Sequence, residues 1–436
     1  MMKSLWARFF SDGVSAKATI IKNTFWLFSG QMVGRLIRAG IVIYGARLLG
    51  ATHWGAFSYA LGFVTFLTVF SDIGINGLIT KEASRNKDLK DQYVSTAFVL
   101  KLGLITATLA LIFVFFPRFS HLEEATRLMP ILIFVFAFDT IRDLAATISR
   151  SLEKMHLEAT TNVLTNLAIV ILGAGALFLH PTAMALALAY AAGSGIGMLA
   201  SFYVLRGHFG NLFTNFRRDL LRPIIVTAWP FGLLAMLGAL MLNTDVIMIG
   251  ALSSAAQVGY YSVAQKIVQL LYVLPTFFAT SIFPMMSRLT SQNREAAAKV
   301  LGKSIALVTL LAIPITVFGV WFAPFIIQLL FGAQYAASVG SFRVLMLTVL
   351  IVYPSMMVGN AAFAFDEQRN FIPFVLTAAL SNVFLNALLI PPFGIVGASF
   401  ATIIAQLTSN IFIWRRMKRV SGFVVWPYLK SYLGGK

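Results

Sequence analysis

The sequence predicts an all-α polytopic membrane protein whose transmembrane helices, about twelve in number, form two six-helix bundles. Three observations lead to this prediction: 58% of the 436 residues are hydrophobic, only 11% are charged, and long apolar stretches follow one another along the chain. A soluble protein carries about 25% charged residues, and a helix needs about 20 apolar residues to cross a bilayer. The length leaves no room for a soluble domain.

Twelve apolar spans follow one another along the chain. They cover residues 24–46, 56–80, 94–116, 128–149, 158–178, 182–205, 224–250, 259–286, 304–330, 338–364, 371–390 and 395–414. Of the 34 Lys and Arg residues, 25 lie in segments on one side of this map, three on the other side and six within spans. Because cytoplasmic loops are enriched in Lys and Arg, both termini are predicted to be cytoplasmic. The Lys and Arg residues of the predicted cytoplasmic segments account for most of the net charge of +18, so a nucleic-acid partner is not needed to explain it.

Short segments recur in the two halves of the chain. Gly-Ala-Phe-Ser-Tyr-Ala at 55–60 returns as Gly-Tyr-Tyr-Ser-Val-Ala at 259–264, and similar matches link residues 83–85 with 286–288 and residues 185–189 with 397–401. Six spans separate the copies, so both halves cross the membrane in the same direction, as in transporters built from parallel repeats. The predicted domains are a first bundle, 1–205, with an interfacial segment at 1–22; a basic cytoplasmic linker, 206–223; a second bundle, 224–414; and a basic cytoplasmic tail, 415–436.

Charged residues inside the spans are the candidate functional residues, because a charge in the bilayer core is costly and normally faces a partner or a watery cavity. Arg35 and Arg38 lie three residues apart on one face of span one. An arginine fork donates two hydrogen bonds at once to a phosphate, so these arginines are predicted to form a cationic cavity wall. The competing interpretation is a structural ion pair in which Asp72 of span two neutralises one of them.

Other spans carry further charges. Asp139, Arg142 and Asp143 lie at i, i+3 and i+4 and form a self-neutralising cluster, which is either a structural brace or part of the transport path. Lys101 and Lys266 are each alone on their spans; either one would snorkel if it lay near an end, and Lys266 is also a candidate for the cavity. The predicted cavity residues are Arg35, Arg38, Asp72, Arg142 and Lys266; Asp245 and Asp139 are candidates for binding a coupling ion or proton, with a helix end near water as the alternative for Asp245.

Several function classes are excluded or disfavoured by what the sequence lacks. It contains no cysteine, and its five histidines lie in or near loops without metal-binding spacing. We therefore predict no metal site and no cofactor. The absence of a nucleotide motif and of a large extracytoplasmic loop argues against a membrane enzyme such as a polymerase or glycosyltransferase.

Longer motifs point to a known family. They are Asn-Thr-Phe-Trp at 23–26, Ala-Arg-Leu-Leu-Gly at 46–50, Ser-Asp-Ile-Gly-Ile-Asn at 71–76, Phe-Pro-Met-Met-Ser-Arg at 283–288 and the run at 389–406. On these residues the chain resembles the polysaccharide transporter branch of the multidrug/oligosaccharidyl-lipid/polysaccharide (MOP) flippase superfamily, whose best-known members are the O-antigen repeat-unit flippases. Span seven departs from the pattern because it lacks an arginine equivalent to Arg35 or Arg38.

The resemblance implies a function. It implies that the two bundles enclose a cavity open to one side at a time, and that the protein flips undecaprenyl-pyrophosphate-linked oligosaccharides to the outer leaflet of the bacterial inner membrane for O-antigen, capsule or exopolysaccharide synthesis. It also implies a monomer that works with a polysaccharide polymerase and chain-length machinery. A cation-coupled multidrug exporter and a lipid II flippase remain alternatives. Six basic charges against four acidic ones within the spans favour an anionic cargo.

Overall fold

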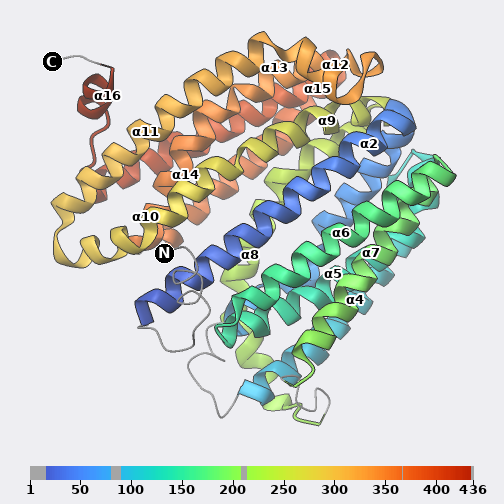
Figure 1. The fold of residues 1–436 in the computed structure, drawn as a ribbon, viewed down its shortest axis with the longest axis horizontal. Coiled ribbons are helices and arrows are strands. Elements are labelled where there is room, and N and C mark those ends of the chain that lie inside the picture. The colour runs from blue at the N-terminus through green and yellow to red at the C-terminus, as the bar shows by residue number, and fades with distance from the viewer. Residues whose placement is uncertain (1–15, 80–89, 208–213, 366, 434–436) are drawn as a thin grey trace, which may run out of the picture.

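A computed structural model describes residues 16–79, 90–207, 214–365 and 367–433, and these are almost entirely helical (Figure 1). The first half contains α2 (Ala16–Asp72), α4 (Lys90–Phe119), α5 (Glu123–Ser151), α6 (Met155–Leu179) and α7 (Ala183–Leu205). The short helix η2 (Arg218–Leu220) precedes the second half, which contains α8 (Leu221–Leu252), α9 (Ala255–Leu271), α10 (Val273–Gln292), α11 (Arg294–Trp321), α12 (Ala323–Phe331), η3 (Ala333–Tyr335), α13 (Ser338–Met346), α14 (Thr348–Ala364), α15 (Gln368–Ser421) and α16 (Trp426–Tyr432).

The described helices agree with the twelve predicted spans. Nine stretches among them are long and apolar enough to cross a membrane, and two of these, Phe25–Asp72 and Ile372–Ser421, are 48 and 50 residues long. One crossing needs only about 20 residues, and a glycine with positive φ interrupts each long stretch: Gly50 (φ 72°) in α2 and Gly394 (φ 56°) in α15. Each stretch is therefore two spans joined by a tight turn. The remaining span, residues 128–149, lies in α5, and the three charges within this span lower its apolar character.

Predicted span eight, residues 259–286, is two helices rather than one. α9 ends at Leu271 and α10 begins at Val273, so the break falls at Tyr272. Pro275 explains this break, because proline lacks the N–H that would bond to the carbonyl of Leu271 four residues earlier. The hydroxyl of Tyr353 donates to that carbonyl instead, at 2.8 Å.

A similar break shortens predicted span nine, residues 304–330. α11 ends at Trp321, and Pro324 starts the separate helix α12. The carbonyl of Val320, which proline leaves without its helical donor, accepts a hydrogen bond from Nε of Arg343 at 3.3 Å. Predicted span ten, residues 338–364, is likewise interrupted, at Leu347 between α13 and α14.

The two halves meet at the recurring segments. Gly55 lies against the backbone of Ala255, and Gly259 lies against the backbone of Ala51, so that a Cβ on either glycine would overlap a carbonyl oxygen. The two contacts are related by the same shift of 204 residues, from 51 to 255 and from 55 to 259. The parallel repeat therefore appears in the structure as a pair of symmetric contacts between the halves.

The halves are in contact along α2 and diverge toward one end. α2 packs against α6 of its own half and against α8 and α9 of the other half. The turns at Gly50 and Gly394 mark one end of the bundles, which is here called the Gly50 end. At this end the buried core runs continuously through both halves. At the opposite end, α10 and α11 turn away from α4 and α5 (Figure 1). The rings of Phe28 and Phe277, with centroids 4.7 Å apart, link α2 to α10.

The predicted peripheral segments are described only in part. Of the predicted interfacial segment, residues 1–22, the first fifteen lie outside the described residues and the rest belong to α2. η2 and the first residues of α8 lie in the predicted linker, and α15 and α16 extend into the predicted tail. The domain boundaries stay a prediction.

Candidate functional site

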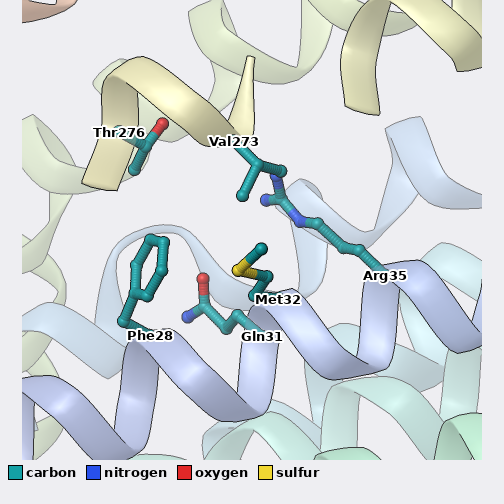
Figure 2. A pocket seen from close by; sticks show the side chains of 6 residues that line it. All are labelled: Phe28, Gln31, Met32, Arg35, Val273 and Thr276. Carbon is teal, nitrogen blue, oxygen red and sulfur yellow. The ribbon is translucent and has the colours of Figure 1, made fainter. Parts of the chain in front are cut away.

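Arg35 lies at a crevice between the two halves. The crevice is lined by Phe28, Gln31, Met32 and Arg35 of α2 and by Val273 and Thr276 of α10. Figure 2 shows the Arg35 side chain extending from α2 toward Val273, next to Met32 and Gln31. Arg35 is exposed, and no ion pair or hydrogen bond to it is found within the described part of the chain. Its charge is therefore available to a ligand.

Arg38 and Lys266 are close enough to interact electrostatically although they come from different halves. Arg38 is half-buried and donates a hydrogen bond from Nε to Oδ1 of Asn166 at 2.8 Å. Its positive charge acts on Lys266 of α9, which is exposed and has no carboxylate partner among the described residues. Arg35, Arg38 and Lys266 together are here called the cationic face.

The positions of Arg38 and Lys266 in the repeat place the two residues at a similar depth in the bundles. Arg38 lies 12 residues before Gly50, and Lys266 lies 12 residues after Ser254, which begins the corresponding span of the second half. At 1.5 Å per helical residue, both lie about 18 Å from the Gly50 end. The cationic face is therefore near the middle of the bundles, at about the depth of the centre of a bilayer core that is about 30 Å thick.

Asp72 does not pair with either arginine of α2. It forms an ion pair with Lys101 of α4, with 3.0 Å between Nζ and Oδ1. Asp72 lies 22 residues after Gly50, about 15 Å further from that end than Arg38. The interpretation in which Asp72 neutralises Arg35 or Arg38 is therefore wrong. Lys101 is only 2% exposed and lies within α4, so the condition for snorkelling, a position near a span end, is not met.

The charges of α5 form a brace within the first half. Arg142 Nη2 lies 3.1 Å from Oδ1 of Asp139, and the charge of Asp143 interacts with both Arg142 and Lys101. Directly beside these charges, the hydroxyls of Ser71 and Thr140 are 3.1 Å apart and link α2 to α5. The contacts of Asp72, Asp139 and Arg142 thus favour the structural interpretation of these residues.

Asp245 is a buried carboxylate surrounded by neutral donors. It is 1% exposed, so it does not lie at a helix end near water. Its Oδ2 accepts from the hydroxyls of Tyr261 (2.5 Å) and Thr402 (2.6 Å), and its Oδ1 accepts from Nδ2 of Asn382 (3.1 Å) and of Asn386 (2.7 Å). Within the described ranges no Lys, Arg or His forms an ion pair with it.

The partners of Asp245 were not predicted from the sequence. Asn382 and Asn386 lie at i and i+4 of span eleven and therefore share one helix face. Two amides at that spacing in an apolar span are the signal that indicates a polar site, because buried polar groups in membranes need partners. The buried Oδ1 atom of Asn386 has no hydrogen-bond partner among the residues that the structure describes. The same argument applies to Asn162 and Asn166 of α6, which lie beside Arg38.

Comparison with known families identifies the type of protein. Residues 20–290, more than half of the chain, match the family described as polysaccharide biosynthesis protein. The chain belongs to this family. Residues 230–392 also match the MatE family, and this second match contains Asp245, Asn382 and Asn386. The predicted membership of the MOP flippase superfamily is thereby confirmed.

Individual relatives are similar over most of their length. The chain is 23% identical to the probable low-salt glycan biosynthesis flippase Agl15 of Haloferax volcanii, over 95% of this chain and 86% of the relative. It is 22% identical to the putative O-antigen transporter of Shigella flexneri, over 85% of this chain and 87% of the relative. Among solved structures it is similar to the lipid II flippase MurJ in an inward closed conformation, with a TM-score of 0.79, 18% identity and coverage of 93% and 90%. The predicted all-α fold of this polysaccharide biosynthesis protein is confirmed.

Proposed function

We propose that this protein flips an oligosaccharide carried on undecaprenyl pyrophosphate from the cytoplasmic to the outer leaflet of the bacterial inner membrane. The observation that carries the proposal is the cationic face. Arg35, Arg38 and Lys266 come from both halves, and the described residues supply them with no carboxylate. A pyrophosphate headgroup needs such compensation, because a charge at the bilayer centre is costly.

The crevice beside Arg35 suits the two chemical parts of this lipid. Phe28, Met32 and Val273 give it an apolar side, while Arg35 gives it a positive charge. It lies between α2 and α10, which belong to different halves (Figure 2). We propose that the pyrophosphate passes Arg35 on its way to Arg38 and Lys266, while the prenyl chain stays in the membrane.

The distribution of basic residues supports the direction of transport. The 25 Lys and Arg residues on one side of the span map favour cytoplasmic termini. The Gly50 end then faces outward, and its closure by Gly55 and Gly259 is consistent with a state open to the cytoplasm. A reporter that is active only outside the cytoplasm, fused after residue 215, tests this topology; strong activity would overturn it.

Asp245 is the proposed coupling residue. Its negative charge has no basic partner among the described residues, so a cation driven by a gradient would compensate that charge. Asp245, Asn386 and Thr402 supply oxygen atoms at this point, and the described part of the chain gives the buried Oδ1 of Asn386 no hydrogen-bond partner. Asp139, the other candidate, is engaged by Arg142 and is therefore the weaker choice.

Two alternatives within the superfamily make different predictions about cargo. A multidrug exporter fits the MatE match of the second half, but the cationic face would repel cationic drugs. A lipid II flippase would use the same pyrophosphate chemistry with a different sugar. We propose a monomer without enzymatic activity that passes its cargo to a polysaccharide polymerase and chain-length machinery.

Reconstitution tests the function directly. Proteoliposomes holding the purified protein and a fluorescent undecaprenyl-pyrophosphate oligosaccharide are treated with an impermeant quencher, which reports the fraction of lipid in each leaflet. We expect translocation of this lipid but not of a cationic dye. Transport of the dye alone would overturn the proposal, and translocation of lipid II alone would support the lipid II alternative.

A further inference from the structure

Two asparagines of α6 form a ladder beside Arg38. Nδ2 of Asn166 donates to the backbone oxygen of Asn162 at 2.7 Å and to its Oδ1 at 3.1 Å. Nδ2 of Asn162 donates in turn to the carbonyl of Gly30 on α2, at 3.2 Å. Because its amino group is engaged in this way, Asn166 presents Oδ1 to Arg38 and accepts the hydrogen bond from Nε.

Close packing of α2 on α6 holds the ladder in place. A Cβ on Gly34 would lie 2.7 Å from Nδ2 of Asn166, and one on Gly30 would lie 2.6 Å from Ala159. On the other side, the guanidinium carbon of Arg38 lies 5.8 Å from the ring centroid of Tyr190 on α7, at the distance of a cation–π contact. Arg38 is therefore fixed both at Nε and at the face of its guanidinium plane.

We infer that Asn166 is a positioning residue that determines which edge of Arg38 meets the headgroup, an inference that rests on the proposed function. A guanidinium offers two edges to a phosphate, one formed by Nε and an Nη and the other formed by both Nη atoms. With Nε bonded to Asn166, only the edge with both Nη atoms stays free, and the described residues give neither Nη a partner. That fork matches two oxygens of one phosphate group.

An asparagine at position 166, rather than an aspartate, preserves the positive charge of Arg38. An aspartate at 166 would also accept from Nε, but it would form an ion pair and cancel the charge of Arg38. The neutral amide orients the guanidinium and leaves its full positive charge for an anion. The ligand class that fits is a phosphate or pyrophosphate group, on a lipid or free in solution.

A double-mutant cycle tests this role. Binding of inorganic pyrophosphate and of undecaprenyl pyrophosphate is measured on the full chain in nanodiscs for wild type, Asn166→Leu, Arg38→Lys and the double variant. Lysine has no Nε–H group, so Asn166 has nothing to orient in the Arg38→Lys background. We expect Asn166→Leu to weaken binding about tenfold with Arg38 present and less than about twofold with lysine. Asn166→Asp is expected to weaken binding by more than Asn166→Leu.

The outcomes separate the inference from the proposed function. Equal losses from Asn166→Leu in both backgrounds would mean that Asn166 only packs α6 against α2, and the inference would be wrong. Unchanged binding in Arg38→Ala would overturn the cationic face itself, whatever Asn166 does. Weakening for the lipid but not for inorganic pyrophosphate would assign the contact to another part of the lipid and would also overturn the inference. If Asn166→Leu does not fold, Asn166→Ala replaces it in the same cycle.

Discussion

The two halves of this protein are most alike where they meet and least alike where they carry charge. Under the 204-residue shift, Gly55 corresponds to Gly259, and the two make equivalent contacts. In contrast, Arg38 corresponds to Leu242, and Asp245 corresponds to Ile41, which is buried and apolar. The first half supplies two arginines, and the second half supplies a buried acid with four neutral donors.

This difference in charge shows how the two copies of a duplicated fold can carry different binding sites. α9 links the two sites, because it carries Lys266 of the cationic face and also Tyr261, which donates to Asp245. An anion bound at the cationic face and a cation bound at Asp245 would then act on the same helix. The asymmetry therefore provides a physical route for coupling cargo to a driving ion, and each prediction below changes one side of it.

The largest effect is expected from removing the arginines of the first half. Arg35→Ala together with Arg38→Ala should reduce flipping by at least about 100-fold, because each charged hydrogen-bonding group contributes about 1.5–3 kcal/mol. The proteoliposome assay measures this, with Arg415→Ala, an exposed arginine near the end of α15, as the matched control. Normal flipping by the double variant would remove the cationic face from the mechanism. Lysine at either position should restore flipping only in part.

The next effect concerns the acid of the second half. Asp245→Asn keeps the shape but removes the charge, so it should abolish the dependence of flipping on a proton or sodium gradient and slow flipping about 10- to 100-fold. Binding of undecaprenyl pyrophosphate should stay unchanged, because Asp245 does not belong to the cationic face. Asp143→Asn, in the first half, is the matched control. A gradient dependence that survives in Asp245→Asn would assign coupling to another residue.

The two equivalent glycine contacts between the halves should be equally sensitive to substitution. Gly55→Ala and Gly259→Ala each place a methyl group against a carbonyl oxygen of the other half, so each should hinder closure of the Gly50 end and slow flipping by about tenfold. Because the chain has no cysteine, a cysteine at the buried position Ser262 reports closure through its rate of alkylation. Gly40→Ala, where nothing lies within 4 Å, is the control. Unequal effects of the two variants would show that the halves close by different contacts.

Hydropathy was sufficient to predict the spans, because bilayer thickness determines span length. The recurring short segments were sufficient to predict the repeat. The pairing of charges was harder to predict, because it depends on which spans become neighbours. Asp72 pairs with Lys101 of the following span rather than with the arginines of the preceding one. The partners of Asp245 are 16 to 157 residues away and come from two other helices. The sequence indicated Asp245 as a single residue, not the polar site around it.

The helix breaks were also difficult to predict from the sequence, because they depend on contacts with other helices. Pro275 and Pro324 lie next to breaks, whereas Pro130 and Pro314 lie inside the continuous helices α5 and α11. Proline weakens a helix at each of these positions, and the structure adds a side-chain donor at the two breaks, from Tyr353 and Arg343. Such donors come from later helices, so the sequence alone did not distinguish breaking from non-breaking prolines.

The smallest effect tests the helix break next to Pro275 in the second half. Pro275 corresponds to Ser71 of the first half, where α2 is unbroken. Tyr353→Phe removes only the hydroxyl that donates to Leu271 and should lower the free energy of unfolding by about 1–3 kcal/mol, measured by denaturation in detergent micelles. Tyr44→Phe is the control. In a Pro275→Ala background the restored N–H can bond to the Leu271 carbonyl, so Tyr353→Phe should then cost much less. An equal cost in both backgrounds would show that Tyr353 stabilises the bundle without capping the break.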